Sequence, residues 1–68
     1  MKLHYYPETD SLYIEFRDAA GVETREIAEG FNLDLDDAGH GVGFDIDRAS
    51  RRLDLSTLET TALPQDAG

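Results

Sequence analysis

Apolar and polar side chains alternate with a period of two at the start of the chain. In residues 2–6 and 11–17 the apolar positions share one face and the polar positions share the other, which is typical of half-buried strands. Residues 7–10 contain a proline and an aspartate and predict a turn between them. If Tyr6 pairs with Ser11, apolar residues oppose apolar residues, so we predict an antiparallel hairpin in that register.

A second hairpin is predicted between residues 31–35 and 42–46, where apolar residues again occupy every other position. Residues 37–40 form the connection and include a glycine that tolerates a positive φ. Pairing Asp36 with Gly41 places the apolar residues of the two strands opposite one another. The predicted apolar pairs are Leu35–Val42, Leu33–Phe44 and Phe31–Ile46.

The segment 22–29 between the two hairpins has a weaker alternation and several charged residues. We interpret it as a solvated edge strand, whose charges discourage association with other sheets. Ile27 is its one clear candidate for the core, and a short helix is the alternative interpretation of the segment.

Beyond residue 46 the period changes to that of a helix. Asp47 is the predicted N-cap, and Ala49 and Leu53, four residues apart, share the apolar side of the helix. Ser56 and Glu59 have the spacing of a capping box, which predicts a second helical turn there.

These elements predict an α+β domain, an antiparallel β-meander of about five strands with one short C-terminal helix packed on the apolar face. Residues 1–60 form this single small domain, and residues 61–68 are predicted to be a frayed tail. Because 68 residues supply only a small core, we expect marginal stability. A homodimer that covers a sheet face or an edge strand would improve it.

The chain is strongly acidic, with 6 Lys and Arg against 15 Asp and Glu and a formal net charge of −9. Such a charge disfavours nucleic-acid binding, because phosphate contacts depend on basic residues, and it favours a basic protein partner. The hydrophobic content of 40% is enough for a small core and excludes a disordered acidic tail. The absence of cysteine excludes disulfides, thiolate catalysis and cysteine-ligated zinc.

Because no apolar run approaches the ~20 residues of a membrane span and residues 1–4 show no signal peptide, we expect a cytoplasmic protein without membrane contact.

Carboxylates and tyrosines on the polar face are the candidate partner-binding residues, because tyrosine is enriched at protein interfaces. The predicted set is Tyr6, Tyr13, Glu15, Asp34, Asp36 and Asp45. The same hairpin partly resembles a calcium loop, but Ala38 stands at a ligand position and Asp45 replaces the longer Glu. We therefore expect a solvated acidic face, with no metal and no cofactor.

The remaining reactive side chains form no recognisable catalytic set, so we expect no enzymatic activity. His4 and His40 have no third partner in the predicted topology. The serines lack the strand-to-helix turn and the His and acid partners that activate a nucleophile.

Half of the basic residues lie in the cluster of Arg48, Arg51 and Arg52. This cluster is the candidate for binding nucleic-acid phosphates, but no aromatic residues interleave with it. We expect the arginines instead to stabilise the helix C-terminus or to pair with nearby acids. Those acids are Asp45, Asp47 and Asp54.

Several segments of the chain resemble a bacterial family known as domain of unknown function 2283. They are residues 5–14, 30–36, 42–46 and 49–53, together with Gly39. Tyr6 departs from the family, which commonly has Asp before the proline. The resemblance implies a small sheet-rich protein with a C-terminal helix and no established catalytic residues. Genes of this family often lie beside those of small basic proteins that look like ribonuclease-type toxins, which implies an antitoxin-like or regulatory role.

The leading hypothesis is a non-enzymatic protein-binding or antitoxin-like regulatory module. It would meet a basic partner, such as a toxin-like nuclease, through its acidic sheet face, with an attraction that weakens as salt rises. One alternative is a homodimeric cation-responsive sensor, and another is a nucleic-acid-binding protein that uses the arginine cluster.

Overall fold

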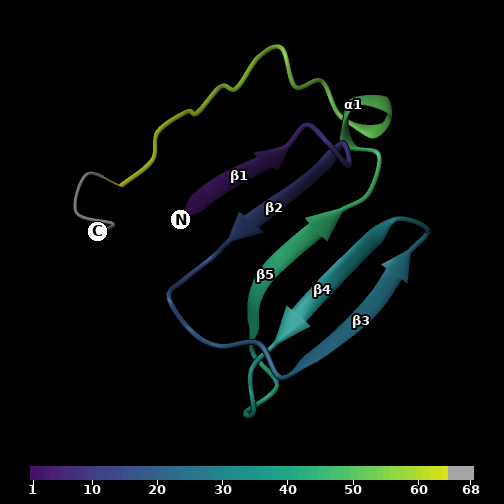
Figure 1. The fold of residues 1–68 in the computed structure, drawn as a ribbon. Helices are drawn as coiled ribbons and strands as arrows, with labels where there is room; N and C mark the ends of the chain where they lie inside the picture. Colours follow the sequence, from purple (N-terminus) through teal and green to yellow (C-terminus); the bar gives the residue numbers. More distant parts are fainter. Residues whose placement is uncertain (65–68) are drawn as a thin grey trace.

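The computed structural model describes residues 1–64, which form an antiparallel five-stranded sheet and one short helix (Figure 1). The strands are β1 (Lys2–Tyr6), β2 (Ser11–Glu15), β3 (Glu23–Ala28), β4 (Phe31–Leu35) and β5 (Gly41–Ile46), and the helix is α1 (Ala49–Arg52). All five predicted strand segments are confirmed, and the fold is mostly β. The segment that the sequence left open between strand and helix is the strand β3. Within the described residues, no helix is long and apolar enough to cross a membrane.

The strand order is β1-β2-β5-β4-β3, which corrects the predicted meander. A meander would place β3 beside β2, but β5 lies there and β3 forms the far edge (Figure 1). The strand with the most buried residues, β5, becomes the centre of the sheet. The two strands whose residues are all exposed, β1 and β3, take the edges. Burial of apolar surface, rather than order along the chain, thus arranges the strands.

The register of both hairpins follows the apolar pairing except at one end. Every predicted pair of β1 with β2 is confirmed. In the second hairpin Leu35 pairs with Gly41 instead of Val42, because a β-bulge shifts the register there. The turn explains the shift: Asp36 N–H donates to the His40 carbonyl oxygen at 2.9 Å, and the Asp36 carboxylate accepts two further N–H groups of the turn.

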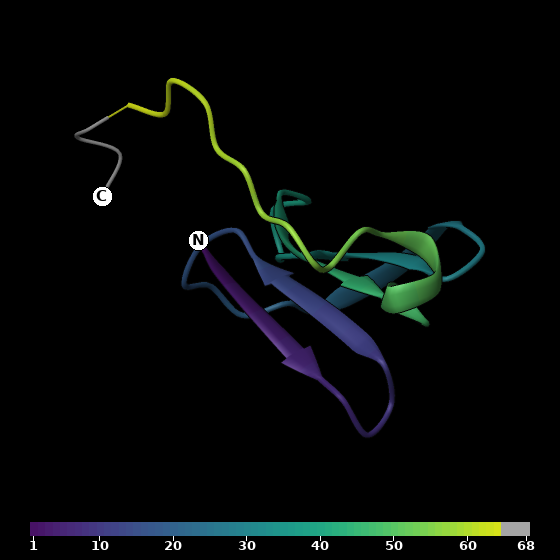
Figure 2. The same ribbon diagram turned by 90° about the horizontal axis from the view of Figure 1, so that it is seen from above.

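The core is small because the sheet is a single layer (Figure 2). The buried hydrophobic residues among those described are Leu12, Leu35, Val42, Ile46 and Ala49. Leu3, Tyr5 and Phe16 of the predicted apolar faces and the predicted core residue Ile27 are exposed instead. The other exposed large apolar residues include Val22, Leu55 and Leu58. A sheet buries an apolar face only when a second layer covers it, and the described residues supply no such layer.

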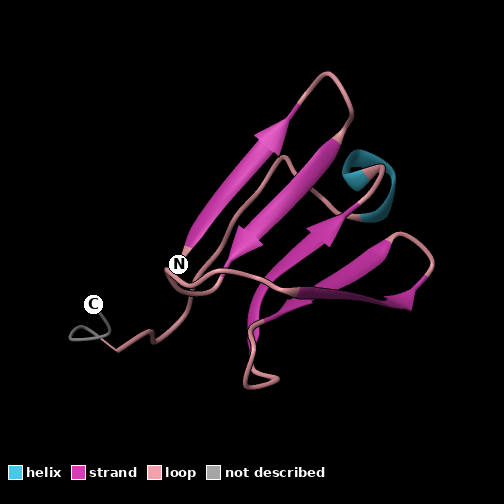
Figure 3. Ribbon diagram, turned by 60° about the horizontal axis from the view of Figure 1, so that its bottom comes forward, coloured by secondary structure: helices cyan, strands magenta, loops and turns pink. Residues whose placement is uncertain are grey.

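The helix α1 lies at one end of the sheet, next to the loop that follows β5 (Figure 3). It has four residues, of which Ala49 is buried against Leu12 and Ile46. A helix of this length cannot cover five strands. The prediction that it packs over the apolar face is therefore not confirmed.

The start of α1 is capped from a distant part of the chain. Asp47, the predicted N-cap, is not the N-cap, a position that Arg48 occupies with a φ of 51° and without a side-chain cap. Asp10, in the turn after β1, performs the function instead. Its carboxylate accepts the Ser50 N–H at 3.1 Å and the Ser50 hydroxyl at 2.7 Å, and its backbone oxygen accepts the Ala49 N–H at 2.8 Å. The first hairpin is thereby tied to the helix.

We expect Asp10→Asn to lower the melting temperature at neutral pH by on the order of 5 °C. Hydrogen bonds from Ser50 and Tyr5 lower the pKa of the Asp10 carboxyl below its ordinary value. A lowered folded-state pKa means that the carboxylate stabilises the fold above the unfolded value, about 4, and that this contribution is lost as the pH falls through the folded-state pKa. Asparagine keeps the tolerance for the φ of 53° at this position and removes only the charge.

Thermal unfolding followed by circular dichroism at neutral and acidic pH measures this difference. Asp37→Asn, in the β4–β5 turn, is the control for loss of one negative charge. A deficit of Asp10→Asn that stays the same in acid would contradict the proposed role of the carboxylate.

The predicted second helical turn at Ser56 does not form. Residues 54–60 contain no helix, and Asp54 accepts the Ser56 N–H at 3.0 Å and the Thr57 hydroxyl at 3.2 Å. Such local bonds compete with the helix that the capping-box spacing suggests. Of the predicted frayed tail, residues 61–64 have no helix or strand, and residues 65–68 lie outside the described residues.

Candidate functional site

Three neighbouring strands place carboxylates on one side of the sheet. Glu15 of β2 pairs with Gly43 of β5, which pairs with Asp34 of β4. Asp45 lies two residues along β5, opposite Tyr13 of β2. Alternation puts these residues on the face away from Leu12 and Ile14. We call Glu15, Asp34 and Asp45, together with Tyr13, the acidic face.

Tyr13 lies across the acidic face. Its hydroxyl reaches over β5 and donates to the Asp34 carboxylate at 3.0 Å, while the Thr24 hydroxyl donates to the other oxygen of Asp34 at 2.7 Å. The ring passes above Gly43, where a Cβ atom would overlap the Tyr13 hydroxyl. Burial, followed by the bond to Asp34, raises the pKa of Tyr13.

The two tyrosines of the predicted set differ in their surroundings. Tyr6 is exposed on β1, with 52% of its surface accessible. Tyr13 is half-buried and held by its bond to Asp34, so it is not the freely exposed aromatic side chain that the sequence predicted. A glycine inside a strand often marks a place where another group approaches the backbone closely. Gly43 could therefore have indicated the position of Tyr13, but the prediction considered only the apolar residues.

The carboxylates of the acidic face have no cationic partner in the described part of the chain. The ion pairs there are Arg17–Asp36, Arg25–Glu23 and, if the histidine is protonated, His40–Asp36. Burial raises the pKa of Asp45, and the negative charges of Asp47 and Asp34 raise it further. The acidic face therefore carries negative charge that none of the ion pairs of the described residues neutralises.

We expect Asp45→Asn to raise the free energy of unfolding at neutral pH by about 0.5 kcal/mol, a value discounted for screening of this partly exposed side chain. Because the folded-state pKa of Asp45 is raised, its favourable contribution is present below the unfolded value, about 4, and is lost as the pH rises through the folded-state pKa. Urea unfolding at neutral pH and near pH 3 measures the difference. The gain should disappear in acid, and a loss of stability at neutral pH would contradict the like-charge interpretation.

Asp36 lies apart from the acidic face, at the turn between β4 and β5. Its carboxylate pairs with Arg17 at 2.6 Å and accepts the N–H groups of Ala38 and His40. These bonds, the one from the His40 N–H first, lower the pKa of Asp36. Its side chain is 15% exposed, so the carboxylate is engaged within the protein before any partner arrives.

The partial calcium-loop pattern does not fold into a loop. Asp34 and Asp45 lie inside strands, and Asp36 is bound to Arg17. Across residues 1–64, no three His, Asp or Glu side chains converge as metal ligands would. The geometry therefore gives no support to the cation-sensor alternative.

The arginine cluster follows the prediction in part, since Arg51 and Arg52 lie in the last turn of α1. Arg52 donates from Nε to the Asp47 carbonyl oxygen at 2.8 Å, and its guanidinium lies 5.6 Å from the centre of the Phe31 ring. A Cβ atom on Gly30, which has a φ of 80°, would lie 2.6 Å from that guanidinium. Within the described residues, none of the ion pairs joins the cluster to the carboxylates of Asp45, Asp47 or Asp54. Arg52 thus packs against Phe31 while it remains exposed.

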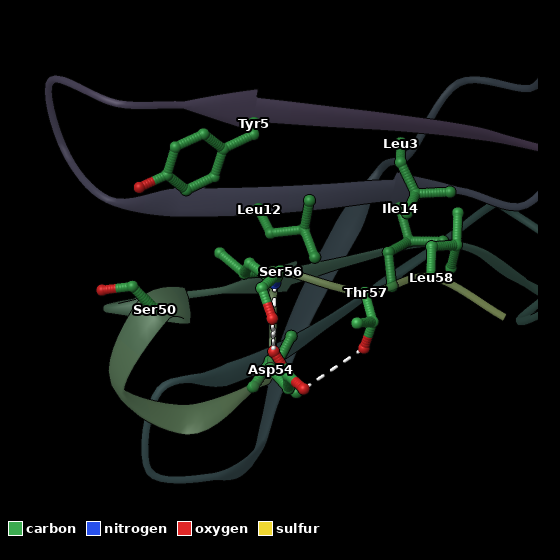
Figure 4. Close-up of a pocket in the computed structure, with 11 residues that line it drawn as sticks. Leu3, Tyr5, Leu12, Ile14, Ser50, Asp54, Ser56, Thr57 and Leu58 are labelled. Atoms are coloured by element: carbon green, nitrogen blue, oxygen red, sulfur yellow. Dashed lines mark hydrogen bonds between the residues drawn. The ribbon is translucent and has the colours of Figure 1, made fainter.

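The opposite face of the sheet contains an apolar groove of about 830 Å³. Leu3 and Tyr5 of β1 form one wall, and Leu58, from the segment after α1, lies across from them (Figure 4). The floor is formed by Leu12 and Ile14 of β2. The four strand residues belong to the apolar face that the sequence predicted for the first hairpin, and the groove exists because no second layer fills it.

Comparison with curated proteins and with solved structures finds no match for the chain. A family model does match, and the match runs over residues 2–50. The matched residues include all five strands and the start of α1. They therefore contain the acidic face and Arg48, the N-cap of α1. The chain therefore belongs to the family described as Protein of unknown function (DUF2283).

Proposed function

We propose that this protein is a non-enzymatic binding module that meets a basic protein through its acidic face. The observation that supports the proposal is the unneutralised charge of Glu15, Asp34 and Asp45 on adjacent strands. Lysine or arginine side chains of a partner would supply the missing counter-charge and would steer association. They would also remove the repulsion that raises the pKa of Asp45.

The partner class that we propose is a small basic nuclease of the toxin type, which this protein would regulate as an antitoxin does. Such a nuclease holds RNA phosphates with lysine and arginine. Carboxylates on neighbouring strands, about 4.8 Å apart per strand, offer those side chains a row of negative charges instead. Occupation of the basic surface would exclude RNA sterically and electrostatically, without any chemical step.

The test is a pull-down from the native host at low salt, with identification of the recovered proteins by mass spectrometry. One bait is the wild-type protein, and a second carries Glu15→Gln, Asp34→Asn and Asp45→Asn. The matched control carries Glu8→Gln, Asp37→Asn and Glu59→Gln, which remove the same charge outside the acidic face. We expect a basic protein with wild type and control, lost with the triple variant of the acidic face and released as salt rises.

Recovery of the same basic protein by all three baits would place the contact elsewhere on the molecule. Recovery of no basic protein at low salt would remove the main support for the proposal. A recovered partner without nuclease activity, or with nuclease activity that this protein does not inhibit, would limit the function to binding and contradict the antitoxin-like role.

A further inference from the structure

The two edges of the sheet differ in their protection against pairing with another strand. β3 carries Glu23, Arg25 and Glu26, and a bulge between Glu26 and Ala28 interrupts its register. Charges and bulges are the usual means by which proteins prevent edge-to-edge association. β1 has an unbroken register with β2, and all five of its residues are exposed. The edge of β1 is therefore the open one.

β1 is also the one strand of the described sheet without an acidic residue. The acids of the other strands are Glu15 in β2, Glu23 and Glu26 in β3, Asp34 in β4 and Asp45 in β5. With a net charge of −9, two copies of the chain repel each other over most orientations. β1, which contains Lys2 and His4, is the strand along which two copies can approach with the least repulsion.

We propose that β1 pairs antiparallel with β1 of a second copy, so that the two sheets become one continuous sheet. With His4 on the two-fold axis the pairing is self-complementary, because Leu3 then lies opposite Tyr5 of the other copy and Lys2 lies opposite Tyr6. Leu3, Tyr5 and Tyr6 are 47%, 45% and 52% exposed, so the pairing covers apolar surface that the monomer leaves in water. Aliphatic–aromatic cross-strand pairs and a cation over an aromatic ring both stabilise such a contact.

The two-fold axis of this pairing is perpendicular to the sheet. It places the two apolar grooves on one side, where Leu3 and Tyr5 of each copy join them across the axis. It places the two acidic faces together on the other side, so the dimer would present twice the acidic surface of one chain. The pairing stands on the edge strand alone and does not depend on what the acidic face binds.

The first test is the mass in solution, measured by light scattering during size-exclusion chromatography. We expect twice the chain mass for the wild type. His4→Glu places two like charges opposite each other on the axis and should raise the dimer dissociation constant by at least about tenfold. The matched control is Ile27→Glu, which adds the same charge to the exposed edge strand β3 and should leave the dimer intact.

The second test does not depend on the stability of a charged variant. Directly opposite residues of an antiparallel pair have Cα atoms about 4.5–5.5 Å apart, a distance that a disulfide spans. Since the chain contains no cysteine, a His4→Cys variant should form a covalent dimer on mild oxidation, and Ile27→Cys should not.

A wild-type protein with the mass of a single chain at all concentrations would overturn the proposal. So would a dimer that persists in His4→Glu and whose His4→Cys variant fails to cross-link, because that dimer would use another surface, such as the apolar grooves face to face. Equal cross-linking of His4→Cys and Ile27→Cys would also overturn it.

Discussion

Ile46→Ala is expected to lower the free energy of unfolding by about 2–5 kcal/mol. Ile46 is 3% exposed in the central strand, paired with Leu12 on one side and Phe31 on the other, and packed against Ala49. The truncation removes buried apolar surface and leaves a cavity under the attachment of the helix. The total free energy of unfolding of a small domain is only several kcal/mol. A loss of this size should therefore unfold most of the variant well below the melting temperature of the wild type. Urea unfolding followed by circular dichroism measures the loss.

The control is the same substitution on an edge strand. Ile27 is 59% exposed in β3, and Ile27→Ala should change the free energy of unfolding by no more than about 0.5 kcal/mol. The contrast between two isoleucines isolates the effect of position in the sheet. Equal losses would contradict the strand order, because that order alone makes β5 central and β3 an edge.

Gly43→Ala is expected to cost about 1–3 kcal/mol, which is the usual cost of adding a methyl group to a filled site. The new Cβ would overlap the Tyr13 hydroxyl and the ring carbon that carries it. Tyr13 would have to swing away and give up its hydrogen bond to Asp34. Loss of that bond also frees the Asp34 carboxylate, so the chemical shifts of Asp34 and Thr24 should move in the NMR spectrum.

A double-mutant cycle with Tyr13→Ala identifies the cause. Without the tyrosine ring the methyl group has free space, and alanine is the better residue in a strand by roughly 0.5–1 kcal/mol. Gly43→Ala should therefore be neutral or stabilising in the Tyr13→Ala background. If the cost is the same in both backgrounds, the close approach of Tyr13 to Gly43 does not explain it.

The local pattern of apolar and polar residues was sufficient to predict where the strands of the two hairpins lie. Alternation predicted all five strands, and the pairing of apolar with apolar residues predicted the register of the first hairpin completely. It also predicted that Glu15, Asp34 and Asp45 share a face, because a strand that pairs in register has only two sides, whereas Asp36 of the same predicted set lies at the turn. Two predicted pairs of the second hairpin, Leu35–Val42 and Asp36–Gly41, were wrong, because side-chain capping by Asp36 tightens the turn, which apolar spacing does not encode.

The local pattern could not predict contacts between residues that are far apart in the sequence. Asp10 caps a helix that begins 39 residues later, and nothing near Asp10 in sequence signals this. The same holds for the contact of Arg52 with Phe31, because the sequence assigned the arginines to the helix C-terminus or to nearby acids and did not predict that ring as a partner. Within the candidate site, the alternation predicted the side of Tyr13 correctly, but its reach across Gly43 to Asp34 depends on which strands are neighbours.

The period-two pattern, read alone, specifies strands, turns and the sorting of apolar from acidic side chains, because each of these depends on residues a few positions apart. The order of the strands, with β5 at the centre and β3 at the far edge, and the exposure of the apolar groove emerge only in three dimensions. They follow from competition among strands for the few buried positions that one sheet layer offers, a competition whose outcome depends on all the strands together.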